Sequence, residues 1–431
     1  MYLNNVHISN YRCIENLQIE FRPGTNIILG DNGVGKTSIL SAIATGLSGY
    51  LEGVKGITPR NIMVGDIRFR MKALGGASAA MEFLTPVEIS CNASYEQEHF
   101  SWVRSRKDES SESRTKTYIR DIASATSIKH FAQDITNNFD GMLPILRYLG
   151  TARTNPSVVK ASTKSSDAVN DRRCGYLGCL HSAIDWNLIK NWCLKMEMEH
   201  FFQQAPMPEY EAFKNMVSNV MMVINELDHR PKIYYSQRFG EIIYQEYDNP
   251  TPITYLSAGY QSILRMVMDI AFRIATLNPQ HGEKMNKTPG IVLIDELDMA
   301  LHPKWQWTVL RALRETFPNI QFIVATHSPI LISSCKDEYL IHIDNDHQIT
   351  YPSAAYGYSV DDVVKFVQGS YRIPKMAQDL YDQFEDAINE DDIPTARRIL
   401  DEMIAEYGAD NTEVKTAMTE LSMADPSYDE E

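Results

Sequence analysis

Alternating apolar and polar residues at the start of the chain predict β-strands over residues 1–8 and 14–21. An uninterrupted apolar run predicts a third strand over residues 25–29, and the apolar residues after it lie three and four positions apart, as in a helix. Strand and helix patterns alternate again over residues 255–351, where the strands are short and wholly apolar. Such strands suit a parallel sheet with helices on both faces. The pattern therefore predicts an α/β fold.

Two other segments are mainly helical in pattern. One follows a polar loop at residues 107–114 and extends to about residue 227, and we expect a lateral insertion there. The other, residues 371–431, holds 17 acidic and five basic side chains, so its net charge of −12 leaves only −3 for the first 370 residues. Three apolar stripes at helical spacing, the second ended by Gly408, predict a helical module. Its apolar faces either pack on the protein's own body or form a docking surface for a partner.

Charge and cysteine content narrow the classes of protein that fit. The net charge of −15 disfavours a protein wrapped in nucleic acid, although it allows a local basic patch around residues 104–120. No apolar run is long enough to predict a membrane-spanning helix, so we expect no membrane partner. Six scattered cysteines predict no disulfide framework, and we expect a cytoplasmic protein. The spacing of Cys174, Cys179, His181 and Cys193 fits no common zinc site and favours buried thiols.

A glycine-rich segment after the third predicted strand matches the phosphate-binding pattern G-x-x-x-x-G-K-[ST] without deviation. Backbone N–H groups of such a loop point at the phosphates of a nucleotide, at the positive end of the next helix. Lys36 is placed to bridge the β- and γ-phosphates, and the Thr37 hydroxyl is placed to bind Mg²⁺. The predicted ATP-binding residues of this loop are Gly30, Asp31, Asn32, Gly33, Val34, Gly35, Lys36, Thr37 and Ser38.

Two further buried strands end in residues that suit nucleotide hydrolysis. The apolar run at residues 291–294 ends in Asp295 and Glu296. We predict that Asp295 holds Mg²⁺ through water and that Glu296 activates the attacking water as general base. The run at residues 321–326 ends in His327, which we expect to sense the γ-phosphate at the same edge of the sheet, where open α/β sheets bind their ligands.

The segment LSAGYQ, residues 256–261, predicts the start of a capped helix. Ser257 is placed as the N-cap, and Gly259 would let an anion approach the free N–H groups of the first turn. Taken alone, this string is also typical of an ordinary capped helix. However, it precedes the strand that ends in Asp295 and Glu296, and this order favours a function in binding an anion.

Together and in this order, the phosphate-binding loop, LSAGYQ, LIDE and ATHS resemble the ATP-binding-cassette (ABC) ATPases of the RecF/SMC group over about residues 1–350. The resemblance implies an ABC-type ATPase sheet, ATP and Mg²⁺ as ligands, and a homodimer or higher homo-oligomer with ATP at the interface. Ser257, Gly259 and Gln261 would then act in trans on the nucleotide of the other protomer. Arg12, in the sequence NYR, would lie near the nucleotide.

The same resemblance divides the chain into four parts. It implies an N-terminal ATPase lobe at residues 1–103 and an insertion at 104–231. A C-terminal ATPase lobe would follow at 232–353, and an acidic helical tail at 354–431.

Softer motifs, among them LPILRYLGTAR at residues 143–153, resemble PtuA, the ATPase of Septu and some retron anti-phage systems. PtuA works beside the HNH nuclease PtuB, so the resemblance implies such a nuclease partner and an ATP-driven switch that controls it. Two alternatives stay open. One is a RecF-like repair factor whose ATP-bound dimer clamps DNA. The other is a nuclease in its own right that uses Asp344 and Asp346, although these residues are more typical of a hairpin turn.

Overall fold

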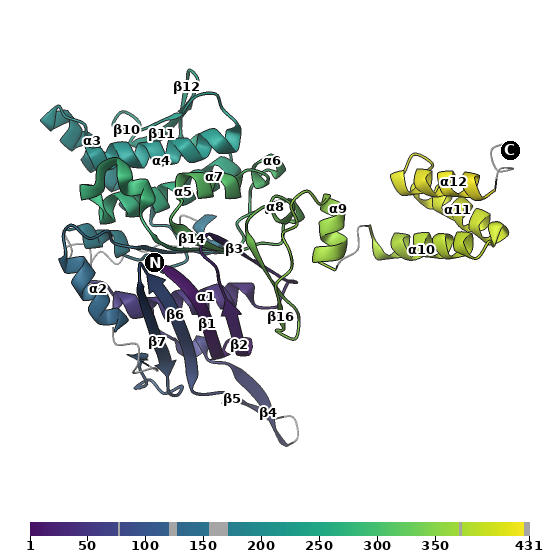
Figure 1. Cartoon of the computed structure of the whole chain (residues 1–431), viewed down its shortest axis with the longest axis horizontal. Helices are drawn as coiled ribbons and strands as arrows, with labels where there is room; N and C mark the ends of the chain where they lie inside the picture. The colour runs from purple at the N-terminus through teal and green to yellow at the C-terminus, as the bar shows by residue number, and fades with distance from the viewer. Residues whose placement is uncertain (76–77, 120–126, 155–170, 370–372, 426–431) are drawn as a thin grey trace. The chain divides into compact units, whose positions relative to one another are not determined.

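The computed structural model describes residues 1–75, 78–119, 127–154, 171–369 and 373–425. The chain divides into two compact units, Met1–Gly357 and Tyr358–Glu431 (Figure 1). The first unit is mixed α/β and the second is helical, in agreement with the predicted fold class. None of the described helices combines the length and the apolar character that a membrane span requires.

A mostly parallel sheet of six strands forms the centre of the first unit. Its strands are β3 (Thr25–Leu29), β9 (Ile145–Leu149), β13 (Gly290–Ile294), β14 (Ile320–Ala325), β15 (Tyr339–Ile343) and β16 (Ile349–Thr350). They lie in the order β16-β15-β3-β14-β13-β9, and β16 runs antiparallel to β15. Every residue of β3, β9, β13 and β14 is buried. Burial on both faces explains their apolar sequences.

A second, antiparallel sheet lies on one side of this centre. Its strands are β1 (Tyr2–Tyr11), β2 (Ile14–Glu20), β6 (Val87–Tyr95), β7 (Glu98–Arg106) and β8 (Lys116–Tyr118), in the order β2-β1-β6-β7-β8. The helix α1 (Lys36–Leu51) packs between the two sheets, which explains why nearly all of its residues are buried. The central sheet therefore holds the start of α1 in a fixed position.

Helices cover the other face of the central sheet, as Figure 1 shows for α4 (Pro208–Asn225), α5 (Ala258–Leu277) and α7 (Val309–Thr316). Three strands, β10 (Lys232–Ser236), β11 (Glu241–Glu246) and β12 (Asn249–Pro252), form an antiparallel sheet beside α4. The remaining elements of this unit are β4 (Phe69–Gly75), β5 (Ser78–Phe83), α2 (Ile128–Asn137), α3 (Trp186–Gln203), α6 (Pro303–Gln306) and α8 (Pro329–Ser333).

The segment 104–231, expected as a lateral insertion, also contributes to both sheets. Its start falls inside β7, which pairs with β6 through Arg106. Farther along, β9 pairs with β13 at the edge of the central sheet. The sequence ILRYL hid this strand because the buried Arg147 interrupts its apolar run. The lobe boundaries drawn from the resemblance stay a prediction.

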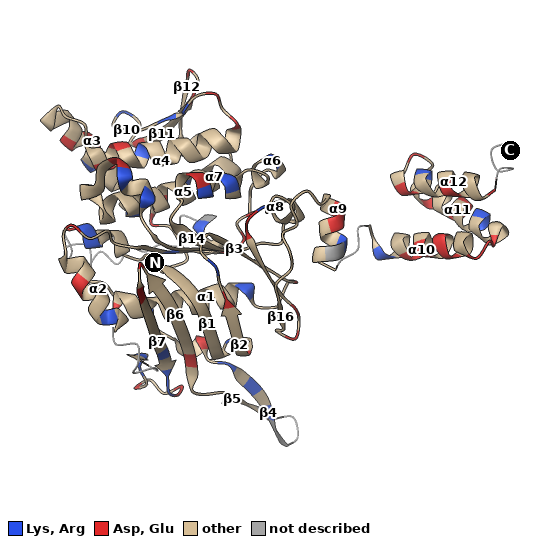
Figure 2. Ribbon diagram, in the orientation of Figure 1, with Lys and Arg blue, Asp and Glu red and all other residues tan. Residues whose placement is uncertain are grey.

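The second unit has a hydrophobic core of its own. Its helices are α9 (Val360–Asp362), a π-helical turn (Val363–Val367), α10 (Lys375–Asn389), α11 (Ile393–Tyr407) and α12 (Thr412–Ala424). The predicted apolar stripes meet in one cluster formed by Tyr381, Phe384, Ala387, Ala396, Ile399, Leu400, Met403, Val414, Ala417 and Leu421. Figure 2 shows acidic residues along these helices. The stripes of α10 to α12 therefore cover one another inside the unit.

Candidate active site

The glycine-rich loop lies between β3 and α1, as predicted. Gly35 is the N-cap of α1 with a φ of 93°, a left-handed conformation that glycine adopts without steric cost. No side chain caps this helix, so its first N–H groups are available to an anion. At Gly30 a Cβ atom would lie 2.3 Å from the carbonyl oxygen of Ile343, so the loop can pass β15 only as glycine.

The Lys36 side chain lies inside this loop. Its Nζ donates hydrogen bonds to the carbonyl oxygens of Gly30 (2.6 Å) and Asp31 (2.9 Å). Burial lowers the pKa of Lys36 to about 8, and the nearby carboxylates of Asp295 and Asp31 oppose this effect. The ammonium group is therefore held where a phosphate would meet it.

The Asp295 carboxylate follows β13 and is only 1% exposed. The Thr37 hydroxyl donates a hydrogen bond to it. Its Oδ2 atom is buried without a hydrogen-bond partner among the described residues, and burial raises the pKa of Asp295. An unpartnered buried carboxylate oxygen beside a hydroxyl is a donor set that suits Mg²⁺. Thr37 and Asp295 therefore fit the predicted metal role.

Glu296 is half-buried and begins the turn after β13. Its φ of 48° lies in the left-handed region, which is strained for a residue with a Cβ atom. Arg153, which follows β9, donates hydrogen bonds to the carbonyl oxygens of both Asp295 and Glu296. Arg153 belongs to the motif LPILRYLGTAR, from which no role for its side chain was predicted.

His327 follows β14, which lies between β3 and β13 in the sheet. Burial and the positive charge of Lys36 lower the pKa of His327, so the imidazole is neutral at pH 7. The neighbouring Thr326 hydroxyl donates to the Asp298 carboxylate at 2.5 Å, a contact that ties the ends of β14 and β13 together. The loop, the carboxylates and the histidine thus meet at the carboxyl ends of three adjacent parallel strands.

Ser257 caps α5 and accepts a hydrogen bond from the Tyr260 N–H at 3.4 Å, and its side chain is exposed. A Cβ atom on Gly259 would lie 2.7 Å from the carbonyl oxygen of Ala300. This glycine is therefore also needed for close packing on the turn after Glu296. The Gln261 side chain donates to the Leu256 carbonyl oxygen at 2.8 Å and so stabilises its own turn.

The trans role of these residues stays a prediction. In the described part of the chain, the hydrogen bonds of Ser257 and Gln261 remain within residues 254–261. None of them reaches the phosphate-binding loop of the same chain.

Arg12 lies in an open cleft of about 500 Å³ beside the site. Its guanidinium forms an ion pair with Asp66 at 2.8 Å. Arg60 and His181 line the same cleft. Contact between Arg12 and a nucleotide stays a prediction.

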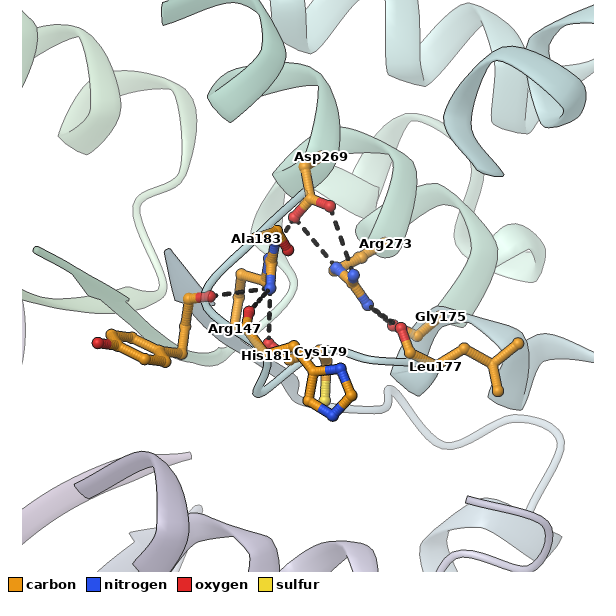
Figure 3. A network of polar contacts seen from close by, with 9 residues as sticks. Arg147, Gly175, Leu177, Cys179, His181, Ala183, Asp269 and Arg273 are labelled. Carbon is orange, nitrogen blue, oxygen red and sulfur yellow. Dashed lines mark hydrogen bonds and ion pairs between the residues drawn. The ribbon is translucent and has the colours of Figure 1, made fainter. Parts of the chain in front are cut away.

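A buried network of charges joins α5 to β9 (Figure 3). The Asp269 carboxylate on α5 accepts hydrogen bonds from Arg147 Nε (2.5 Å) and Arg273 Nε (3.1 Å). The remaining donors of the two guanidinium groups bond mainly to backbone carbonyls of residues 175–183. All three side chains are at most 2% exposed. The helix that Ser257 caps is therefore fixed to the strand beside β13.

The structure contradicts the basic patch considered around residues 104–120 at Arg104 and Arg106, because both side chains are buried. Arg104 is fully buried and forms an ion pair with Glu52 at 3.2 Å. Arg106 is 7% exposed and donates to three backbone carbonyls. Both side chains stabilise the fold because packing against α1 draws this part of β7 into the interior. Residues 120–126 lie outside the described residues.

Other candidate sites have structural explanations. Cys179 and Cys193 are buried free thiols, and burial raises the pKa of Cys179 to about 11. Asp344 accepts the N–H groups of Asp346 (2.9 Å) and Gln348 (2.7 Å), so it stabilises the turn between β15 and β16, as predicted. Among the described residues, no group of three or more His, Cys, Asp or Glu side chains could hold a metal ion.

Comparison with known proteins agrees with this geometry. A family model described as an AAA domain matches residues 5–205, and one described as an AAA ATPase domain matches residues 189–332. Together the two models match residues 5–332, so most of the chain resembles AAA-type ATPase domains.

Similar proteins include retron ATPases and Septu proteins. The retron Vc95 probable ATPase of Vibrio cholerae serotype O1 biovar El Tor is 24% identical over 387 residues, which cover 78% of this chain and 72% of that protein. The Septu protein PtuA of Bacillus thuringiensis is 22% identical over 397 residues, 86% of this chain and 84% of that protein. The chain thus resembles PtuA, as predicted. A solved SMC head bound to the C-terminal winged-helix domain of ScpA is also similar, with a TM-score of 0.49 and 15% identity over 82% of this chain and 98% of that one.

Proposed function

We propose that this protein is the ATPase subunit of an anti-phage defence system, in which it dimerises on ATP and controls a partner HNH nuclease. One observation carries the ATPase part of this proposal. The phosphate-binding loop, the unpartnered carboxylate oxygen of Asp295, Glu296 and His327 converge at one edge of the central sheet. Similarity to a retron ATPase and to PtuA supports the role in defence.

The chain's own residues account for the chemical step. ATP binds with its phosphates in the loop before α1, and Lys36 exchanges the carbonyl oxygens of Gly30 and Asp31 for phosphate oxygens. Mg²⁺, held by Thr37 and Asp295, would neutralise charge on those oxygens. Glu296 accepts a proton from the water whose oxygen attacks the γ-phosphorus. The bond between that phosphorus and the bridging oxygen breaks, and ADP leaves.

Two protomers complete each site in this proposal. The exposed Ser257 hydroxyl and the first turn of α5 offer hydrogen-bond donors to an anion, and a second copy of the chain would supply that anion as bound ATP. Residues Ser257, Gly259 and Gln261 would then contact the γ-phosphate of the partner's nucleotide. ATP binding favours the closed dimer because only that state satisfies both halves of the site.

The nuclease partner and the compartment belong to the same proposal. The second unit buries its apolar side chains within itself and carries acidic residues outside, which suits a polar docking surface for a partner. In our account, nucleotide turnover keeps the nuclease inactive until infection disturbs it. Six free cysteines, four of them buried, support a reducing cytoplasm.

The proposal is tested by expressing the chain with a small HNH protein encoded beside it. We expect the two to purify as a stable complex whose nuclease activity is low with ATP and rises when ATP is depleted. The ATP-dependent clamping of short duplex DNA at moderate salt by the chain alone would support a RecF-like repair factor instead. Metal-dependent cleavage by the chain alone, lost on changing Asp344 and Asp346 but not Glu296, would show that it is a nuclease itself.

A further inference from the structure

Arg153 holds the backbone of both predicted active-site carboxylates. It lies in the 3-10 turn Thr151–Thr154, directly after β9, and is 4% exposed. Nη1 donates to the carbonyl oxygens of Gly150 (3.2 Å) and Asp295, and Nη2 donates to that of Glu296 (2.5 Å). One planar guanidinium group thus contacts two consecutive carbonyls.

This contact occurs together with an unusual backbone at Glu296. In an extended strand the carbonyls of neighbouring residues point to opposite sides, so one guanidinium cannot reach both. Here Glu296 has a φ of 48°, which turns its carbonyl to the same side as that of Asp295. A residue with a Cβ atom stays in this conformation only where its surroundings hold it.

The neighbouring β9 and β14 segments both contribute to that support. From β14, the Ala325 carbonyl oxygen accepts a hydrogen bond from the N–H of Leu297 at 3.2 Å. The N–H of Asp295 donates to the Leu149 carbonyl oxygen at 2.8 Å, and the carbonyl oxygen of Asp295 accepts from Arg153. On the far side, the N–H of Met299 donates to the Glu296 carbonyl oxygen at 2.9 Å. The Asp295 carbonyl is therefore held from the β9 side, and Arg153 is the side-chain contact there.

We propose that Arg153 is a positioning residue that keeps the Glu296 carboxylate aimed at the attacking water. This inference rests on the proposed role of Glu296 as general base. The guanidinium does not touch the substrate; it acts through the Asp295 and Glu296 carbonyls.

The test is the steady-state ATPase activity of Arg153→Lys. Lysine keeps the charge but cannot span two carbonyls with a rigid fork. We expect kcat to fall by about 10- to 100-fold, as for other supporting hydrogen bonds around an active site. We also expect KM for ATP within twofold of the wild-type value and unchanged ATP-dependent assembly.

Arg106→Lys is the matched control, because Arg106 is also buried and also donates to three backbone carbonyls. It should lower the melting temperature by a similar amount and leave kcat unchanged. Equal kcat values for Arg153→Lys and Arg106→Lys would overturn the proposal. If Arg153→Lys does not fold, the shorter and uncharged Arg153→Gln replaces it with the same expected result.

A double mutant tests whether Arg153 affects turnover through Glu296 or independently of it. In the Glu296→Gln background, Arg153→Lys should cause no further loss of residual turnover. A second loss of 10-fold or more would show that Arg153 acts on something other than Glu296.

A different result would show that the proposed ATPase function, and not the role of Arg153, is wrong. A wild-type protein that binds ATP but never hydrolyses it would contradict the ATPase role. The positioning role is then decided by a crystal structure of Arg153→Lys. A negative φ at residue 296 would support it, and a retained left-handed conformation would overturn it.

Discussion

At the residue scale, Lys36 shows how burial prepares a side chain for phosphate. Lys36 is 6% exposed, and its ammonium group donates hydrogen bonds to neutral partners, the backbone carbonyls of its own loop. Burial therefore disfavours the charged form and lowers its pKa to about 8. A bound triphosphate would favour the charged form, so ATP binding and protonation of Lys36 should support each other.

This linkage predicts that ATP affinity falls at alkaline pH. The pKa of Lys36 is about 8 in the free protein and higher when phosphate is bound. Protons are therefore taken up on binding above pH 8, and the Kd for ATP should rise by up to about tenfold per pH unit there. Between pH 6.5 and 7.5 it should stay nearly constant. Isothermal titration calorimetry measures the effect.

Two variants define the controls for this experiment. Lys36→Arg stays charged throughout and should lose the pH dependence, while Lys36→Ala should not bind ATP. A wild-type Kd that is equal at pH 7 and pH 9 would contradict a titrating Lys36 in the phosphate site.

The sequence predicted site residues that belong to short contiguous motifs. Lys36, Asp295 and His327 each come after a buried and mainly apolar strand, and the order of strands in the sheet then brings them together. Arg153 and Asp298 could not be assigned in the same way. Arg153 acts through backbone carbonyls of a strand 142 positions away, and Asp298 through a hydroxyl on another strand. Such contacts depend on tertiary packing, which local sequence does not specify.

At the element scale, the start of α5 is packed tightly on the turn that follows Glu296. The backbone of Gly259 passes the Ala300 carbonyl so closely that a Cβ atom would lie 2.7 Å from its oxygen. Asp269 on the same helix is fixed to β9 through Arg147. The helix that begins with Ser257 is thus tied both to the turn after Glu296 and to β9, the strand next to β13.

We predict that Gly259→Ala disturbs this packing. The added methyl group should lower the free energy of unfolding by about 1–3 kcal/mol, the usual cost of overpacking a buried contact. It should also reduce ATP turnover while the Kd of the monomer for ATP stays unchanged, because the phosphate-binding loop is not touched. Urea unfolding measures the free energy of unfolding, an ATPase assay measures turnover, and calorimetry measures the Kd.

Gly65→Ala is the control for stability, because a Cβ atom there would meet no atom within 4 Å. Equal unfolding free energies for the two alanine variants would contradict the steric role of Gly259.

Most helices and strands could be predicted because their buried positions follow the periodicity of the element. The buried strands β13 and β14 are mainly apolar runs, and the helices of the second unit carry apolar stripes that meet in its core. Prediction missed β9 because Arg147 stands in the middle of a fully buried strand. A buried guanidinium is tolerated there only because Asp269 and several carbonyls satisfy it, and those partners lie far away in sequence.

At the scale of the whole molecule, charge is divided unequally between the two units. The first carries the candidate active site and is nearly neutral, while residues 371–431 carry a net charge of −12. Because the second unit has its own core, it does not need the first to bury its apolar side chains. Nucleotide binding and partner docking can then be separated by truncation.

We predict that a chain ending at Gly357 binds ATP with a Kd within twofold of the full-length value. No residue of the candidate site lies beyond that point, and the core of the second unit is formed by its own helices. The shortened chain should lose much of its affinity for the HNH partner, and the affinity of the full chain should weaken with salt. Loss of ATP binding on truncation would contradict the independence of the two units.

The central claim is that two protomers share each ATP site, and the most direct test is the mass of Glu296→Gln with and without ATP and Mg²⁺. This variant should bind ATP without hydrolysing it, so sedimentation velocity should show at least a doubling of mass when ATP is added. Adding Ser257→Arg should abolish the increase while leaving ATP binding to the monomer intact. A Glu296→Gln protein whose mass is the same with and without saturating ATP would contradict the shared site.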